Sequence, residues 1–390
     1  MENGTHLMSI RLLGPLLLVG TLILAALPAA SAAQRAPDTG WTVAETLEID
    51  VEGAPGAVSP DGAWIAGRGE DDSLCLWETP ALTEHCRDEV DHVDESSIAW
   101  SPNGRYIAFA QAGAGFDSDI FLFDLRTQTL TNLTDDRIDE MGNPEEGGKY
   151  GTFDQDPVWS PTGDEILFRR SNQPLLDQDF VALMRVRLET GQVIRVHDIV
   201  ADEPFTMLAP PLWLPDDTIL FSVWENPEIN GLWRVGVNGA EPHSIPLSYD
   251  ERALAMPMAL AATPEGDRVL IHAWDRYENL DPDRLTNYWL DLDPGTLEPV
   301  GAGTGDVPNA QTPIRLSPDG DAYVYALGNE LDATIVIEDA TTGQTTVIAD
   351  HAALYGWESL FGLTWTTSSQ ILIPTQDDRW LLLTLEPPNP

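Results

Sequence analysis

Basic side chains are scarce in this sequence. Its 390 residues include 20 Lys and Arg against 64 Asp and Glu, a formal net charge of −44, and Lys149 is the one lysine. Nucleic-acid binding needs clustered Lys or Arg to displace the counterions of the phosphates, and no basic run occurs. The composition therefore excludes a nucleic-acid partner. Two interpretations of the excess of acidic side chains stay open. They could form a solvated surface that keeps an exported protein soluble, or their carboxylates could bind a cation or a cationic partner.

Several catalytic motifs are also missing. The sequence has no Gly-x-Ser-x-Gly elbow, no His-Glu-x-x-His motif, no cysteine cluster for zinc and no glycine-rich phosphate loop ahead of a helix. The histidines after the N-terminal segment lie far apart: His85, His92, His197, His243, His272 and His351. They are expected to pack strands or face solvent; the alternative is that the fold gathers several round an axis to hold a metal. We expect a binding protein, with enzyme activity as the open alternative.

The two cysteines lie almost symmetrically about a short turn. Cys75 and Cys86 flank Thr79-Pro80-Ala81, so a hairpin here would place them on opposite strands. In an exported chain this arrangement predicts a disulfide. The alternative is a pair of buried thiols.

The N-terminus carries the one long apolar run. Arg11 precedes Leu12 to Leu27, and the small-residue stretch Ala29 to Ala33 comes after it. This order is typical of a cleaved secretory signal. We therefore expect a signal peptide over residues 1–32, a linker over 33–40, and a protein of the periplasm or the extracellular space. The alternative, an uncleaved membrane anchor, needs a longer span than about sixteen residues.

One tetrapeptide recurs along the remaining chain. Clear copies begin at Ser59, Ser101, Ser160 and Ser317, all of the form Ser-Pro-x-Gly, and weaker copies begin at Leu214, Thr263 and Thr366. Pro at the second position presets φ, and Gly at the fourth accepts a left-handed conformation, so each copy predicts a tight turn between two strands. Successive copies start 42 to 59 residues apart, which is the period of a four-stranded propeller blade.

Short apolar strands surround each turn, and no helical periodicity interrupts them. The sequence predicts an all-β fold, a seven-bladed β-propeller of four-stranded antiparallel blades in one domain over residues 41–386, followed by a proline-rich tail over 387–390. The last unit, Phe361 to Glu386, has three strands. Thr42 to Val51 is expected to supply the fourth and so close the ring. Six blades with a stray terminal hairpin are the alternative.

The repeated Ser-Pro-Asp-Gly, with a Trp before it and a third strand of the type Asp119-Ile120-Phe121 after it, resembles the TolB-like, WD40-like β-propeller family. The resemblance covers Trp41 to Glu386 and is specific for blade architecture. It implies a propeller fold and, because the family includes protein-interaction scaffolds, a function in binding. Similar propellers also cap serine peptidases. The fourth, fifth and seventh units depart from the motif, which leaves their borders open.

Long connections are expected to gather at one end of the blades, since alternate strand-to-strand links lie together. They are Asp135 to Asp156, Ser171 to Asp179, Trp224 to Asn230, Trp274 to Asn287 and His351 to Leu360. Long loops on a rigid scaffold commonly bind partners, and aromatic side chains provide contact area at low entropic cost. The binding-face candidates are Tyr150, Phe153, Asp154, Asp156, Trp224, Trp274, Asp275, Arg276, Tyr277, Tyr355 and Trp357. Packing of the loops onto the blades is the alternative for each.

Pairs of acids two residues apart can chelate calcium through alternate oxygens. The candidates are Asp117 with Asp119, Asp154 with Asp156, and Asp281 with Asp283, and none matches an EF-hand loop. We expect a monomer with no cofactor, or with weak structural calcium. Its partner would be a protein, a peptide or a carbohydrate, and no part of the mature chain would insert stably in a membrane. The alternatives are a metal-assisted polysaccharide lyase or glycan hydrolase, and a structural module of a cell-envelope assembly.

Overall fold

The computed structural model describes most of the chain from Gly40 onward. Within residues 40–387 it leaves out 51–52, 88, 91, 113–116, 136–151, 173–180, 200–209, 224–230, 250–251, 264–265, 275–284, 293–298, 304–313, 330–331, 353–362 and 375–379. The predicted signal peptide, nearly all of the predicted linker and residues 388–390 of the predicted tail lie outside the described residues. The strands all belong to one compact unit, Thr39–Pro390.

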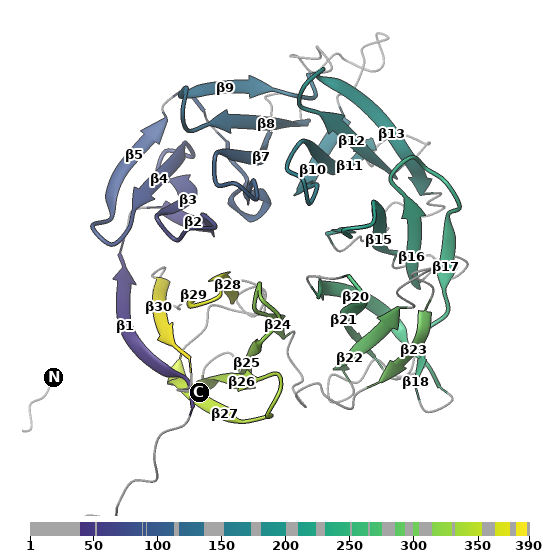
Figure 1. Ribbon diagram of the computed structural model, residues 1–390. Helices are drawn as coiled ribbons and strands as arrows, with labels where there is room; N and C mark the ends of the chain where they lie inside the picture. The colour runs from purple at the N-terminus through teal and green to yellow at the C-terminus, as the bar shows by residue number, and fades with distance from the viewer. Residues whose placement is uncertain are drawn as a thin grey trace, which may run out of the picture. The chain divides into compact units, whose positions relative to one another are not determined.

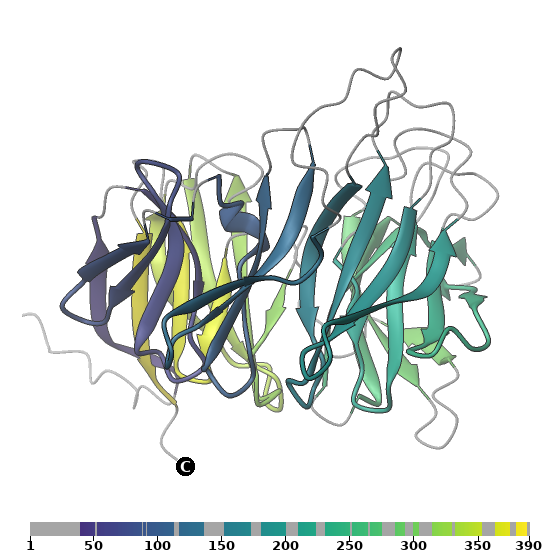
Figure 2. The same cartoon turned by 90° about the horizontal axis from the view of Figure 1, so that it is seen from above.

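The described residues are all-β, as predicted, apart from one short 3-10 turn, η1 (Glu95–Ser97). None of them belongs to a helix that is long and apolar enough to cross a membrane. The strands form antiparallel sheets that succeed one another in chain order round a common centre (Figure 1). Within each sheet the strands run between the same two ends (Figure 2).

The first half of the unit contains four strand groups, each written from its inner to its outer strand. The first is β2 (Gly53–Val58), β3 (Trp64–Gly69), β4 (Leu74–Glu78) and β5 (Thr83–Arg87). The second is β6 (Ala99–Trp100), β7 (Tyr106–Ala112), β8 (Ser118–Asp124) and β9 (Thr129–Asn132). The third is β10 (Thr152–Trp159), β11 (Glu165–Asn172), β12 (Val181–Arg187) and β13 (Gln192–Ile199). One parallel pairing, Phe153 with Ser118, joins the second and third groups. The fourth is β14 (Leu212–Trp213), β15 (Thr218–Val223), β16 (Gly231–Gly236) and β17 (His243–Ile245).

The second half repeats the arrangement. A small hairpin that the sequence did not predict comes first, formed by β18 (Ser248–Tyr249) and β19 (Arg252–Ala253). The fifth group follows it and consists of β20 (Ala255–Ala262), β21 (Arg268–Trp274), β22 (Leu285–Leu292) and β23 (Pro299–Gly303). The sixth is β24 (Arg315–Leu316), β25 (Ala322–Asn329), β26 (Asp332–Asp339) and β27 (Thr345–Ala352). The last is β28 (Thr364–Thr367), β29 (Gln370–Pro374), β30 (Trp380–Glu386) and β1 (Thr42–Ile49).

The recurring tetrapeptide forms the predicted tight turn between inner and second strands. In the first copy, the Ser59 hydroxyl donates to Asp61 Oδ1 at 2.6 Å and accepts from the Trp64 amide at 2.9 Å. The amide of Gly62, at φ 70°, donates to the Ser59 carbonyl at 2.8 Å. The copies at Ser101 and Ser317 repeat these bonds. Ser and Asp are used here to satisfy the turn itself, so the motif builds the fold.

The tryptophan that precedes several of the turns joins neighbouring sheets. The indole N–H of Trp100 donates to the Ala57 carbonyl at 3.2 Å, and that of Trp159 donates to the Ala99 carbonyl at 3.0 Å. Trp365 bonds to the Arg315 carbonyl in the same way at 3.1 Å. Each bond runs from one inner strand to the inner strand of the preceding sheet. The repeat therefore carries a polar link between sheets as well as a turn.

Apolar side chains fill the spaces between successive sheets. Ile107 and Phe109 pack against the first sheet with Leu76, whereas Ala108 and Ala110, on the other face of β7, pack against the third group. Comparable clusters join the third group to the fourth, the fourth to the fifth, the fifth to the sixth and the sixth to the last. Each sheet is apolar on both faces, so its neighbours on the two sides exclude water from it.

The last sheet combines the two ends of the unit. β1 pairs antiparallel with β30, from Thr42 opposite Glu386 to Ile49 opposite Trp380. The sequence predicted this pairing for residues 42–51. Ile49 is fully buried in a cluster with Leu372 and Leu382 of its own sheet and with residues of the first sheet. The first and last sheets are therefore in contact through β1.

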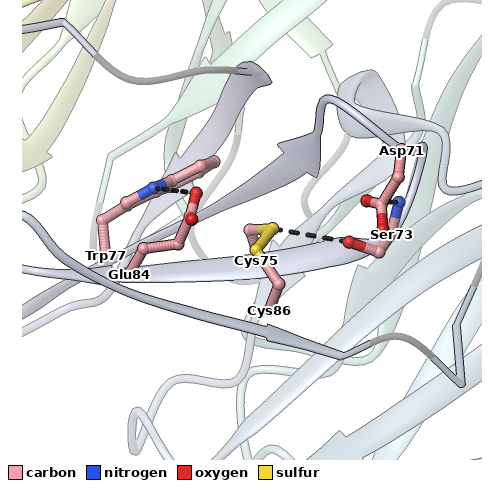
Figure 3. Close-up of a disulfide and its surroundings, with 6 residues drawn as sticks. All are labelled: Asp71, Ser73, Cys75, Trp77, Glu84 and Cys86. Atoms are coloured by element: carbon pink, nitrogen blue, oxygen red, sulfur yellow. Dashed lines mark hydrogen bonds between the residues drawn. A yellow bond between two sulfur atoms is a disulfide. The ribbon is translucent and has the colours of Figure 1, made fainter.

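The predicted disulfide is present between β4 and β5. Cys75 lies directly opposite Cys86 in the strand register, and their sulfur atoms are bonded (Figure 3). On the same stretch, Trp77 donates its indole N–H to Glu84 at 3.0 Å. Cys75 and Trp77 are fully buried in the cluster that contains Ile49. The disulfide thus fixes the surface of the first sheet against which β1 packs.

Replacement of Ile49 tests the contribution of β1. Ile49→Ala leaves a cavity between the first and last sheets, so the free energy of unfolding should fall by about 3 kcal/mol. The control Thr46→Ala, at an exposed position of the same strand, should change it by less than about 0.5 kcal/mol. Urea unfolding followed by tryptophan fluorescence measures both. Equal effects of the two substitutions would contradict the packing described for β1.

The indole link can be tested separately. Trp159→Phe removes the donor of the Ala99 carbonyl and should lower the free energy of unfolding by about 1–2 kcal/mol more than Trp213→Phe. Trp213 occupies the corresponding place in the next sheet, and its Nε1 has no hydrogen-bond partner among the described residues. Urea unfolding of both variants provides the comparison; a larger loss from Trp213→Phe would show that ring packing, and not the hydrogen bond, is what these tryptophans contribute.

Candidate binding face

The two ends of the sheets differ in their connections. One end, the tight-turn end, carries the tetrapeptide turns and links such as residues 188–191 between β12 and β13. The other, the long-loop end, carries the links from second to third strands and the links between sheets, as the antiparallel alternation requires. Most of the long connections lie outside the described residues. The described side chains near them show how this end is built.

Some of the predicted loop residues prove to be strand residues. The connection expected over Asp135 to Asp156 ends earlier, because β10 begins at Thr152 and includes Phe153, Asp154 and Asp156. Asp154 is fully buried, and its two oxygens accept from Arg170 Nε at 2.6 Å and Nη2 at 2.5 Å. The two residues are opposite each other in the β10–β11 register. A cross-strand ion pair of this kind lets a charged residue occupy a strand interior, and this corrects the loop assignment.

Asp156 lies two residues further on, at an irregularity of β10. Its φ is 55°, unusual for a residue other than Gly. Arg169 Nη2 lies 3.0 Å from Asp156 Oδ2 and donates to Gln155 Oε1 at 3.0 Å. Burial raises the pKa of Asp156, the Arg169 charge opposes that rise, and Asp94 adds to it. Residues held in such backbone conformations tend to cluster at functional sites.

A second charged cluster connects the first two sheets at this end. Arg68 donates from Nε to Glu95 Oε2 at 2.8 Å and from Nη1 to Asp72 Oδ1 at 2.6 Å. These two hydrogen bonds raise the pKa of Arg68. Asp94 caps η1 by accepting from the Ser96 amide at 3.1 Å. Asp72, like His92 beside it, has a positive φ. Strained backbone and paired charges therefore occur together here as well.

His272 and Asn287 are buried polar residues of the fifth sheet. The side chain of His272 has no solvent exposure, and its Nδ1 lies 2.9 Å from Asn287 Oδ1 on β22. Burial is the main cause that lowers its pKa to about 4; the Asn287 hydrogen bond opposes the shift, and the charge of Arg315 adds to it. The sequence alone gave this histidine no specific role. Asn287, expected in a loop, belongs to β22.

These polar residues share one position in the repeat. Arg68, Arg169 and His272 each lie nine residues after the first residue of their turn, at Ser59, Ser160 and Thr263. Ser222 takes the equivalent place in the fourth sheet, where the turn is one residue shorter, and Ala110 and Ala326 take it in the second and sixth. Counting from the tetrapeptide would have identified this position from the sequence, since it alternates between polar and small residues from one sheet to the next.

The remaining binding-face candidates lie largely outside the described residues. This holds for Tyr150, Trp224, Asp275, Arg276, Tyr277, Tyr355 and Trp357. Trp274 is the last residue of β21, opposite Leu285, and Phe153 pairs with Ser171. Trp274 was expected at the start of a loop, and it is placed by a strand. These aromatic residues stay predictions for a binding role.

The calcium candidates differ in how their carboxylates are used. Asp119 accepts from Asn132 Nδ2 at 2.8 Å and from Thr134 Oγ1 at 3.2 Å, next to the half-buried Asp117. Asp154 and Asp156 pair with different arginines, while Asp281 and Asp283 lie outside the described residues. A cation at the second pair would have to displace Arg170 from Asp154, so that pair fits calcium poorly.

Within the described ranges, one group of three acidic or sulfur side chains is close enough to share a metal: Cys75, Glu84 and Cys86. Its two cysteines are consumed by the disulfide. Metal binding needs thiolates, so this group is a structural element of the first sheet.

The fold can be compared with known proteins. No family model and no curated protein matches the sequence. Among solved structures, an oligogalacturonate lyase in complex with manganese is similar with a TM-score of 0.62 at 14% identity, over 87% of this chain and 91% of that one. The β-propeller domain of Myceliophteria thermophila Cps50 (Swd1) gives 0.53 at 14% identity, over 87% and 99%. TolB from Acinetobacter baumannii gives 0.43 at 14% identity, over 90% and 65%.

At these identities the likeness shows the fold alone. The chain has an all-β, propeller-type fold, like the β-propeller domain of Cps50 (Swd1). The β-propeller resemblance expected from the repeats is confirmed at the level of the fold. Binding proteins and enzymes share such folds, so function has to be argued from the residues of this chain.

Titration of His272 gives a prediction for stability. The unfolded chain takes up a proton at this residue near its ordinary pKa of 6.5, whereas the folded chain does so only near 4. The stability that the neutral imidazole confers is therefore complete above pH 6.5 and is lost as the pH falls towards 4, by about 3 kcal/mol at most. The difference in unfolding free energy between wild type and His272→Gln should narrow by that amount between pH 7 and pH 4. Urea unfolding at several pH values measures it; a constant difference would contradict the assignment.

Proposed function

We propose that the sheets form a seven-bladed propeller closed by β1. The support is the set of apolar clusters, each of which joins two sheets that are consecutive in the chain, together with the cluster that joins the last sheet to the first. The pairing of β1 with β30 supplies the fourth strand of the last sheet. A closed ring leaves no sheet with an uncovered apolar face.

The function that the geometry supports best is reversible binding at the long-loop end. One observation carries this proposal: in four of the sheets the repeat-equivalent position near this end holds a polar residue, namely Arg68, Arg169, Ser222 and His272, whereas the motif serines of the tight-turn end hydrogen-bond within their own turns. The inner strand carries the strained Asp156 beside Arg169. A polar, preorganised rim on a rigid scaffold is typical of recognition surfaces.

The partner on this proposal is a protein, a peptide or a carbohydrate met outside the cytoplasm. Export rests on the N-terminal segment, with Arg11 before a run of apolar residues and a small-residue stretch after it. The acid-rich composition disfavours polyanions such as nucleic acids. The predicted aromatic residues of the long connections would provide the contact area.

A metal-assisted lyase or glycan hydrolase is the second candidate. The observation that favours it is the buried, neutral imidazole of His272, a suitable metal ligand or base in an enzyme site. The similar oligogalacturonate lyase was solved with manganese. Against it, the described carboxylates Asp154 and Asp156 are paired with arginines. Release of unsaturated or reducing ends from polysaccharides, with and without added manganese, separates this candidate from binding.

A double substitution in a long connection tests the proposed face. The mature chain is applied to peptide and glycan arrays, and the affinity of each bound probe is then measured by calorimetry. Trp274→Ala with Tyr277→Ala should weaken binding at least about 100-fold, because two aromatic contacts are lost.

The control is Arg126→Ala with Glu189→Ala, two exposed residues of the tight-turn end, which should leave the affinity unchanged. Binding that survives the aromatic double variant and is lost in the control would place the partner at the opposite end.

A further inference from the structure

His272 has one ring nitrogen that the described protein does not use. The residue lies on β21 between Met258 of β20 and Asn287 of β22 in the strand register. Nδ1 contacts Asn287, while Nε2 is buried and has no hydrogen-bond partner among the described residues. Buried polar atoms are satisfied in nearly all native structures, so an exception points to a bound water, an ion or a ligand.

The chemical character of this nitrogen is set by its neighbours. Asn287 Oδ1 also accepts the Ile314 amide, at 3.5 Å, so the atom that faces His272 is an acceptor. Nδ1 must then carry the proton and donate it, which leaves Nε2 with a free lone pair. Near neutral pH the ring is uncharged, because burial holds its pKa at about 4. Nε2 can therefore accept a hydrogen bond and has no proton to donate.

A second buried polar atom lies at the same level of the preceding sheet. Ser222 occupies the repeat position equivalent to His272, is 1% exposed, and its Oγ has no hydrogen-bond partner among the described residues. β15, which carries Ser222, and β21, which carries His272, both pack against β20. Two unsatisfied groups thus flank one inner strand near the long-loop end.

The charges around His272 and Ser222 restrict the kind of ligand that can hydrogen-bond to these two side chains. A ligand cation at Nε2 would be repelled by Arg315, whose charge already disfavours a proton on His272. A polyanion would be repelled by a chain of net charge −44. A neutral hydroxyl group meets neither penalty. It can donate to Nε2, and another hydroxyl can exchange hydrogen bonds with Ser222 Oγ, which both donates and accepts.

We propose that His272 and Ser222 form a hydroxyl-binding subsite, and that the ligand of this propeller is a neutral carbohydrate. The inference rests on the proposed binding function and names its substrate class. His272 accepts a ligand hydroxyl through Nε2, and Asn287 holds the ring in the tautomer that this requires. A site built to bond a hydroxyl rejects analogues that lack it, because its polar groups would then stay buried and unpaired.

The experiment uses the full mature chain and defined probes. Neutral cello-, xylo-, malto- and manno-oligosaccharides are compared with oligogalacturonates and with basic and acidic peptides by calorimetry. We expect a neutral oligosaccharide to bind best, and Ser222→Ala and His272→Gln each to weaken it about 10-fold or more. The matched control His85→Gln, at an exposed position of β5, should bind as wild type. Ser222→Ala keeps the test valid if His272→Gln fails to fold.

An NMR measurement on the wild-type protein provides a second test of the proposed subsite. With ¹⁵N-labelled histidine, the Nε2 resonance of His272 should shift when the neutral oligosaccharide is added, as a new hydrogen bond forms. Unchanged affinity in both variants with an unmoved Nε2 resonance would overturn the subsite and leave a buried water as the partner of that atom. Binding of peptides or oligogalacturonates alone would also overturn it while the proposed binding function stands. Absence of binding to every probe would count against both.

Discussion

The whole structure depends on sheets that are apolar on both faces. Along β7, Ile107 and Phe109 face one neighbouring sheet while Ala108 and Ala110 face the other. A four-stranded sheet of this kind cannot be stable alone, because both of its apolar faces would meet water. Covering by neighbours on both sides fixes the order of the sheets, the position of each inner strand and the direction in which each connection leaves. The polar residues of the candidate binding face lie in the halves of the strands nearer the long-loop end, and several of them are buried.

The polar groups at the two ends of the sheets come from different parts of the repeat. At the tight-turn end, Ser59 and Asp61 hydrogen-bond within the turn, and the Gly of one turn lies against the Pro of its neighbour, as Gly104 does with Pro60. At the long-loop end the corresponding polarity is supplied by side chains of the second strands, such as Arg169, whose partners lie on a different strand. The motif that reveals the fold is therefore separate from the residues of the candidate binding face.

Local patterns predicted the turns, the strands after them, the disulfide and the pairing of β1 with β30, since each of these depends on residues that are close in sequence or on a missing strand. The candidate site was harder to predict from the sequence. Asp154 and Asp156 suggested a loop because isolated carboxylates seldom occupy strand interiors, and their neutralisation by Arg170 and Arg169 becomes visible only once the β10–β11 register is known. His272 was one of several scattered histidines, and its hydrogen bond with Asn287 and the nearby charge of Arg315 come from other strands.

The pairing of Thr42 with Glu386 has a consequence for the order in which the molecule can form. β1 has no strand partner until β30, the last strand, has been synthesised, so until then Ile49 can pack only against the first sheet. Non-local pairings of this kind slow folding. The burial of Ile49 is therefore completed only when the last strand of the unit joins the sheet.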